Sequence, residues 1–112
     1  MAIDWAGVVA FALTLPGAEL SRSYGRPALK VRGKAFACTG KRDDHFVLMA
    51  ELDAVDMLME TEPDVFFQTD HYKGWPAVLV RYDSADPERV VALLERAWDR
   101  RASKAQRATR DK

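Results

Sequence analysis

The sequence contains one cysteine, no long apolar run and no excess of charge of either sign. Cys38 has no second cysteine to pair with, so an internal disulfide is excluded and the chain fits a reducing compartment such as the cytoplasm. The apolar start of the chain lacks the basic region of a signal peptide and is too short to span a bilayer. The 17 basic and 17 acidic residues cancel, which argues against binding of nucleic acid through bulk charge. We therefore expect a cytoplasmic protein without a membrane partner.

Motifs that would indicate catalysis are also missing. The chain has no glycine-rich phosphate loop and no G-x-S-x-G nucleophile motif. His45 and His71 are not at metal-ligand spacing with other ligands. Cys38 stands in an alternating segment without a base beside it, which favours a buried structural cysteine. We therefore expect no catalytic residue, no metal, no cofactor and no enzyme activity.

Size and composition are typical of one globular domain. The chain has 112 residues, of which 48% are hydrophobic and 30% are charged, so it can bury a core without disulfides or metal. We place the domain at residues 1–103. Residues 104–112 are basic and have no apolar period, so we expect a frayed tail there.

Three apolar stripes at three- and four-residue spacing predict three helices. The first follows a capping Asp4 and consists of Trp5, Val8, Val9, Ala12 and Leu13. The second consists of Leu52, Val55, Leu58 and Met59, and Asp53 is the predicted cap of its helix. The third begins with a capping Asp86 and Pro87 at the first helical position, and its stripe consists of Val90, Leu94, Ala97 and Trp98.

Segments with a period of two predict strands between these helices. They are ALKVR, KAFACT, HFVLMA, a short DVFFQTD, WPAVLVRY and a weaker strand between Glu19 and Tyr24. Phe36 and Cys38 are expected to face the core, and Arg32-Gly33 is expected to form a tight hairpin turn. The order of elements predicts an α+β domain with helices packed on one face of an antiparallel sheet.

Charge is distributed unevenly along the chain. Every charged residue between Leu20 and Arg42 is basic, and every charged residue between Asp43 and Asp70 is acidic. Five cations flank two tight loops: Lys30, Arg32, Lys34, Lys41 and Arg42. Long cations on hairpins can contact phosphates, whereas lysine on an edge strand can serve to prevent pairing between sheets. A basic binding face and mutually neutralising solvated faces are therefore both open interpretations.

The segment TDHYKGWPAVLVRY places an unusual group of side chains around one glycine. His71, Tyr72, Lys73 and Trp75 precede a strongly apolar strand. In a structural interpretation, Tyr72 and Trp75 pack at the strand entrance and His71 satisfies a backbone carbonyl. In a functional interpretation, the rings stack on a ligand and Lys73 contacts a phosphate.

Three spaced blocks, PGAELSRSYGRPALKVRGKAFA, DHYKGWPAVLVRY and ERAWDRRASK, cover nearly the whole chain. Together they resemble the MmcQ/YjbR family of small bacterial proteins. The resemblance implies a CyaY-like fold with the N- and C-terminal helices packed on an antiparallel sheet. It also implies DNA binding through a double-wing arrangement of hairpins, which here are the hairpin through Arg32-Gly33-Lys34 and the loop through Lys41-Arg42.

Two classes of function compete on this basis. In a DNA-binding protein, the five loop cations and Lys73 contact phosphates, with support or stacking from His71, Tyr72 and Trp75. In a protein-interaction or adaptor domain, a partner docks on the acidic second helix or on an exposed sheet edge. A small-molecule binder would instead need a concave pocket with convergent polar groups.

Overall fold

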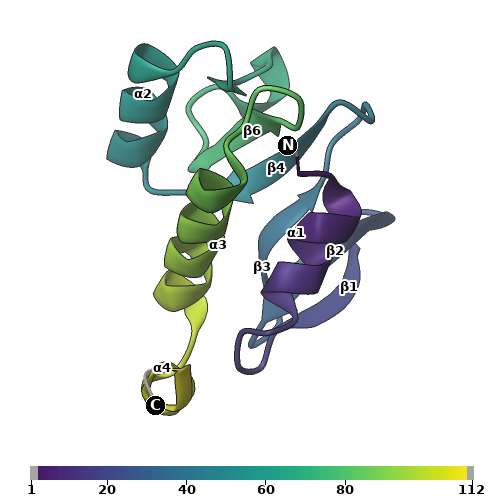
Figure 1. Ribbon diagram of the computed structural model, residues 1–112, viewed down its shortest axis with the longest axis vertical. Helices are drawn as coiled ribbons and strands as arrows, with labels where there is room; N and C mark the ends of the chain where they lie inside the picture. The colour runs from purple at the N-terminus through teal and green to yellow at the C-terminus, as the bar shows by residue number, and fades with distance from the viewer. Residues whose placement is uncertain (1–2, 111–112) are drawn as a thin grey trace.

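Six antiparallel strands form one sheet in the order β1-β2-β3-β4-β6-β5. The computed structural model describes residues 3–110 (Figure 1). The strands are β1 (Glu19–Ser23), β2 (Arg26–Val31), β3 (Lys34–Thr39), β4 (His45–Met49), β5 (Phe66–Phe67) and β6 (Ala77–Arg81). β4 and β6 lie side by side inside the sheet and have four consecutive buried residues each, because both of their faces are covered. All predicted strands are confirmed.

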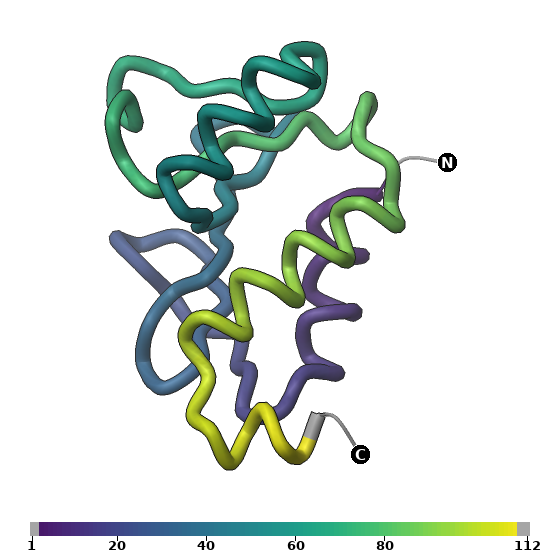
Figure 2. The backbone as a smooth tube through the Cα atoms, turned by 90° about the vertical axis from the view of Figure 1, so that its left-hand side faces the viewer, coloured from purple at the N-terminus to yellow at the C-terminus, as the bar shows by residue number. Residues whose placement is uncertain are grey.

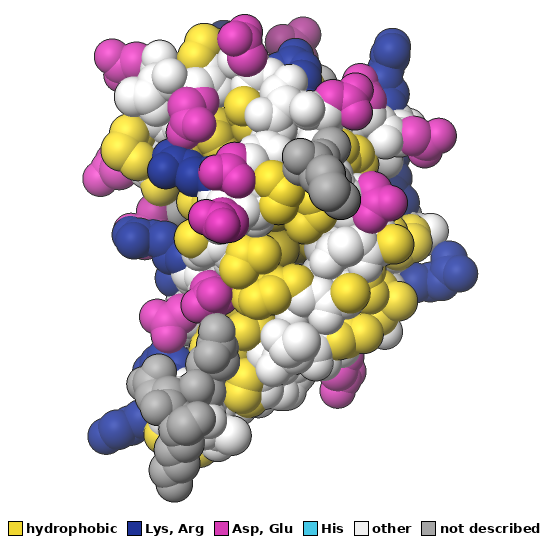
Figure 3. Space-filling model, in the orientation of Figure 1, with side chains coloured by type: hydrophobic (Ala, Val, Ile, Leu, Met, Phe, Trp, Pro, Cys, Tyr) yellow, Lys and Arg dark blue, Asp and Glu magenta, His cyan; other side chains and the backbone are white. Residues whose placement is uncertain are grey.

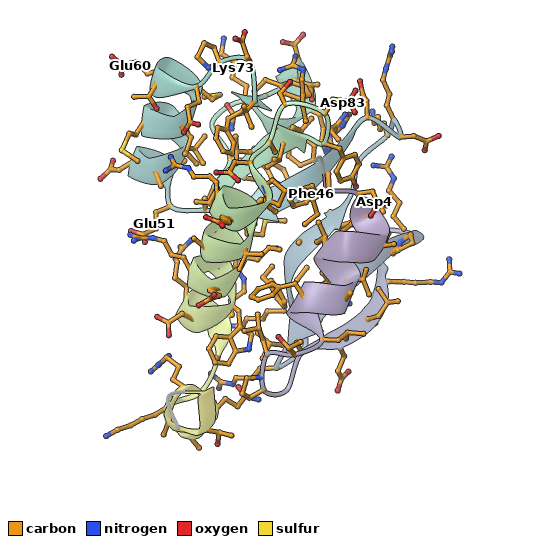
Figure 4. All side chains as sticks on the ribbon, in the orientation of Figure 1. Asp4, Phe46, Glu51, Glu60, Lys73 and Asp83 are labelled. Atoms are coloured by element: carbon orange, nitrogen blue, oxygen red, sulfur yellow. The ribbon has the colours of Figure 1, made fainter. Side chains whose placement is uncertain are left out.

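Helices α1 (Trp5–Ala12) and α3 (Pro87–Arg101) lie side by side on one face of the sheet, and α2 (Leu52–Thr61) contacts β5 and β6 (Figures 1 and 2). The main core fills the space between these helices and the sheet. At its centre Phe46 stacks on Tyr82, with ring centroids 5.6 Å apart, and lies between α1 and α3 (Figure 4). Apolar side chains also gather at the surface between α1 and α3 (Figure 3). The predicted α+β architecture is confirmed.

Local sequence signals explain why α1 and α3 begin where they do. The Asp4 carboxylate accepts a hydrogen bond of 2.9 Å from the Gly7 amide, and the Asp86 carboxylate accepts one of 3.2 Å from the Glu88 amide. Both contacts satisfy amides that have no partner inside a helix. The predicted stripe of α3 is buried in full. None of the helices among residues 3–110 has the length and apolar character needed to cross a membrane.

The predicted beginning of α2 was wrong. The helix starts at Leu52 after Glu51, and Asp53 lies inside its first turn. There its carboxylate still interacts favourably with the helix dipole. Leu52 is exposed, whereas Val55 and Leu58 are buried, because only one side of this helix meets the sheet. Leu13 is exposed for a similar reason, since α1 ends one residue before it.

A β-bulge in β3 corrects the predicted orientation of Cys38. Leu29 pairs with Ala37 and Lys30 pairs with Ala35, so Phe36 has no partner in β2. The extra residue reverses the alternation of side chains beyond it. Phe36 and Ala37 both join the main core, while Cys38 packs on the opposite face of the sheet.

The C-terminal residues also differ from the predicted frayed tail. Lys104–Arg110 forms helix α4, and residues 111–112 lie outside the described part of the chain. The Ser103 amide donates to the Gln106 side chain at 2.8 Å, and the Gln106 amide donates to the Ser103 hydroxyl at 3.1 Å. This reciprocal pair is a capping box, which begins a helix without requiring an apolar period.

Two tight turns determine which loops share an end of the sheet. Arg32 and Gly33 have φ values of 55° and 76°, and Tyr24 and Gly25 have values of 52° and 79°. Positive φ at both central positions is the type I′ geometry that matches strand twist, which confirms the predicted Arg32-Gly33 turn. Because the strands alternate in direction, the turn before β2 and the loop after β3 lie at one end, and the Arg32-Gly33 turn lies at the other.

Candidate nucleic-acid interface

The face of the sheet opposite the helices, here called the open face, has a small apolar cluster of its own. Val47, Ala77 and Leu79 are buried at its centre, and the partly buried side chains around them are Cys38, Met49, Phe67 and Tyr72. Residues 68–76 fold back over this cluster from the end of β5. This segment includes a single 3₁₀ turn, η1 (Asp70–Tyr72). The open face therefore consists of the apolar cluster on the sheet and, along one side of it, a wall formed by the 68–76 segment.

Hydrogen bonds hold the 68–76 segment in place. The Gln68 amide donates to the carbonyls of Trp75 and Ala77, at 3.3 and 2.7 Å. The Trp75 amide donates to the Tyr72 carbonyl at 2.9 Å, and Gly74 has a φ of 82°. A residue with a side chain rarely takes that conformation, so glycine closes the turn that presents Tyr72 to the sheet.

Three aromatic rings of this segment contact one another. Ring centroids are separated by 4.7 Å between His71 and Tyr72, by 5.7 Å between His71 and Trp75, and by 5.9 Å between Tyr72 and Trp75. Tyr72 is half-buried on the sheet, as the structural interpretation of this corner predicts. Trp75 is 51% exposed, and His71 and Lys73 are also exposed. The corner is thus anchored by Tyr72 and presents the other three side chains to solvent.

A cavity of about 290 Å³ lies between this wall and the β3–β4 loop, residues 40–44. Residues of β4, β5 and β6, the β3–β4 loop and the 68–76 segment line it: Lys41, Arg42, Asp44, His45, Phe67, Thr69, Tyr72, Leu79 and Arg81. Its apolar parts are Phe67, Leu79 and the Tyr72 ring. Three cations line it as well, so it combines flat apolar surface with positive charge, which suits a planar anionic ligand.

Arg81 is held in a fixed orientation at this cavity. Its guanidinium carbon lies 3.9 Å from the centroid of the Phe67 ring, in cation–π geometry. One of its nitrogens also makes long hydrogen bonds of 3.4 Å to the carbonyls of Pro63 and Asp64. Among the described side chains, none of Lys41, Arg42 and Arg81 forms an ion pair. Of the lining residues that the structure describes, Asp44 is the one carboxylate, so the three cations leave the cavity with net positive charge.

His45 and Asp44 form the inner edge of the cavity. His45 is 5% exposed, and its Nδ1 donates to the Asp44 carboxylate at 2.7 Å. This hydrogen bond lowers the pKa of Asp44 below its ordinary value despite some desolvation, and the charges of His45 and Arg42 act in the same direction. The His45 ring contacts Phe67 edge to face at 5.3 Å. Its other side lies against Gly40, where a Cβ would collide with the ring.

The structure brings only some of the predicted site residues together. Lys41, Arg42 and Tyr72 line one cavity, and His71, Lys73 and Trp75 belong to the segment that carries Tyr72. The remaining cations, Lys30, Arg32 and Lys34, lie toward the other end of β3. Six residues at about 3.3 Å each separate the two ends by roughly 20 Å.

The sequence analysis missed six residues that line the cavity: Asp44, His45, Phe67, Thr69, Leu79 and Arg81. One signal could have found Arg81, since in WPAVLVRY it alternates in phase with Leu79 on an otherwise apolar strand. Nothing local indicated that β6 would lie beside β4, where Arg81 pairs with His45. The third strand of this group, β5, adds Phe67 opposite Leu79.

A second hollow, of about 470 Å³, lies along α3 and is less suited to an anion. Its cations already have partners, because Arg89 pairs with Glu62 at 2.7 Å and Arg96 pairs with Glu51 at 3.3 Å. Over residues 3–110, no group of three His, Cys, Asp or Glu side chains is placed to hold a metal ion.

Cys38 provides a test of how the 68–76 segment covers the open face. Burial raises the pKa of the Cys38 thiol, with Arg26 opposing, and burial followed by the Cys38 charge raises the pKa of Tyr72. The native thiol is expected to react with a disulfide reagent at about pH 8 at least about tenfold more slowly than the unfolded protein. Tyr72→Ala is expected to accelerate the native reaction by about tenfold, because it removes this cover.

Tyr24→Ala is the matched control for that experiment, because Tyr24 is fully exposed on the β1–β2 turn. It should leave the labelling rate of the native protein unchanged. Equal rates for the unsubstituted protein and Tyr72→Ala would show that Tyr72 does not shield Cys38.

These features define a small α+β domain that covers one face of an antiparallel sheet with helices and leaves a basic, aromatic cavity on the other. The chain belongs to the YjbR family, whose model matches residues 13–100. This finding confirms the family resemblance seen in the sequence. The fold is similar to the crystal structure of Deinococcus radiodurans protein DR2400, whose domain is described as DUF419. That similarity has a TM-score of 0.74 and 17% identity, and covers 93% of this chain and 85% of that one.

Curated relatives match over a shorter region. The chain is 40% identical over 47 residues to uncharacterized protein Mb2600 of Mycobacterium bovis and to uncharacterized protein Rv2570 of Mycobacterium tuberculosis. The match covers 42% of this chain and 36% of each relative. The chain thus spans about a third of the length of the curated relatives it matches.

Proposed function

We propose that this protein binds DNA without catalysing a reaction, and that it does so through the open face of the sheet. The observation that carries the proposal is the convergence of Lys41, Arg42 and Arg81, none of them in an ion pair among the described residues, on a cavity walled by Tyr72. Cations without an ion-pair partner contact phosphates, and an aromatic ring beside them can stack on a base.

The surroundings of the cavity support the same function. Lys73 and Trp75 are exposed on the segment that carries Tyr72, so a strand leaving the cavity on this side meets another cation and another ring. At the far end of β3, Arg32 and Lys34 are exposed on a type I′ turn. Two basic regions separated by roughly 20 Å along the sheet suit a ligand with charges repeated along its length.

A neutral protein can bind DNA in this way because local charge matters more than net charge at contact distance. At physiological salt, charges beyond about 8 Å are largely screened. The acidic residues of α2 lie on the helix-covered side of the molecule (Figure 3). Their effect on a phosphate at the open face is therefore small.

Salt dependence tests the proposal. Labelled DNA is titrated with the protein at about 50 and about 200 mM salt, and binding is followed by fluorescence anisotropy. Three phosphate contacts predict that affinity falls roughly 20- to 40-fold between these conditions. Absence of binding at the lower salt concentration would refute the proposed function, and binding without salt dependence would refute the role of the cations.

A further inference from the structure

We propose that the open-face cavity takes one unpaired nucleotide, so that the protein prefers single-stranded DNA to duplex DNA. The inference rests on the proposed function and specifies the form of DNA that the site selects. In this arrangement the phosphate of the nucleotide lies against Lys41, Arg42 and Arg81, and its base lies against the Tyr72 ring.

The size of the cavity limits what can enter. Pockets that enclose small organic ligands are about 300–1,000 Å³, and this one, at about 290 Å³, lies just below that range. One nucleotide is therefore accommodated, while a base pair or a large cofactor is not. A paired base is also stacked on both sides within its duplex, so it cannot present a face to a protein ring without being unpaired first.

The chemistry of the lining matches the two halves of a nucleotide. The half-buried Tyr72 ring supplies apolar surface to a base, and stacking on an aromatic side chain suits every base because every base has a π-face. Thr69 and Asp44 are the polar groups within the cavity that can contact base edges. The Asp44 carboxylate accepts hydrogen bonds, which suits the amino groups of bases, while His45 offsets part of its repulsion of phosphate.

Arg81 fixes the position of the phosphate and thereby the side of the cavity on which the base lies. Its guanidinium is held on Phe67 and by two backbone carbonyls, so little side-chain entropy is lost when a phosphate binds. Lys41 and Arg42 approach from the β3–β4 loop on the other side. A phosphate between them leaves the attached base on the Tyr72 side of the cavity.

Duplex DNA can use only the cations of this site. Lys41, Arg42 and Lys73 are exposed and can contact the phosphates of either form, but only an unpaired base can reach Tyr72. A substitution of Tyr72 is therefore expected to lower the affinity for single-stranded DNA alone, whereas a substitution of a lysine lowers the affinity for both forms.

The experiment compares a labelled single strand with the hairpin duplex of the same sequence, at about 50 mM salt, by fluorescence anisotropy. The single strand is expected to bind at least about fivefold more tightly, because stacking of one base contributes about 1–3 kcal/mol. Tyr72→Leu, which keeps an apolar cover over the sheet, should lower single-strand affinity by about 5- to 100-fold and leave duplex affinity unchanged. Tyr72→Phe keeps the aromatic ring and should bind the single strand as tightly as the unsubstituted protein. Tyr24→Leu is the matched control and should change neither.

A competition experiment on the unsubstituted protein tests the inference even if the Tyr72→Leu variant does not fold. Thymidine monophosphate at millimolar concentration should displace the single strand, whereas inorganic phosphate at the same concentration and ionic strength should not. Equal affinity for the two forms, or a single-strand preference that survives Tyr72→Leu, would overturn the inference while the proposed function stands. Failure of both forms to bind would overturn the proposed function with it.

Discussion

Reversing the charge of both Lys41 and Arg42 to glutamate is expected to weaken DNA binding by about 10- to 100-fold at about 50 mM salt. Both side chains are exposed on the β3–β4 loop, line the open-face cavity and form no ion pair among the described residues. The substitution therefore removes two phosphate contacts and adds repulsion without disturbing a packed side chain. Anisotropy titrations over a salt series should also show that the slope of log affinity against log salt falls by about two.

Two further double variants show whether the effect is local. Arg22→Glu with Lys104→Glu makes the same change in net charge at exposed positions on β1 and α4, away from the cavity, and should alter affinity by less than about threefold. Arg32→Glu with Lys34→Glu tests the far end of the sheet, where an intermediate loss is expected. If the control pair weakens binding as much as the Lys41 and Arg42 pair, the contacts are not at the open face.

Trp98→Ala is expected to lower the free energy of unfolding by about 3–5 kcal/mol. Trp98 is 2% exposed in the main core, and its indole nitrogen donates to the Pro16 carbonyl at 2.9 Å. The side chain thus connects α3 to the loop after α1, which is far away in the sequence. Its removal leaves a large cavity and an unsatisfied carbonyl. Urea denaturation followed by far-ultraviolet circular dichroism measures the loss.

The matched control is Trp75→Ala, the same substitution at a tryptophan that is 51% exposed. It is expected to cost less than about 1.5 kcal/mol, because much of that ring remains in water. Trp98→Phe separates the hydrogen bond from the packing and should cost about 1–3 kcal/mol. Equal losses for the Trp75 and Trp98 variants would mean that the 68–76 corner is as important to the core as α3, and would remove Trp75 from the binding surface.

The helices show how far local signals determine this fold. Asp4, Asp86 and Pro87 are local signals that predict where α1 and α3 begin, and the stripe of α3 predicts its buried side. These predictions succeeded because capping and periodicity involve neighbours within one turn. The helix α4 was overlooked although its Ser103–Gln106 capping box is also local, because the search for a helix relied on apolar period alone.

The bulge at Phe36 shows where local signals end. KAFACT alternates cleanly, yet Cys38 faces the side of the sheet opposite Phe36, because the register between β2 and β3 shifts by one residue. Register depends on how two strands fit the same core, and a slip of one residue reverses every side chain beyond it. The sequence of one strand alone therefore does not predict this shift.

The candidate site divides in the same way. By itself the sequence determined which chemical groups were available: cations on two loops, and His71, Tyr72, Lys73 and Trp75 around one glycine. Only the tertiary structure decided which of them meet. It placed Lys41 and Arg42 beside Tyr72, moved Arg32 and Lys34 to the far end of β3, and added Arg81 and His45 through the pairing of β4 with β6. The physical reason is that a local pattern assigns a side chain to one face of its own strand or helix, whereas a cavity requires several elements to pack against one another.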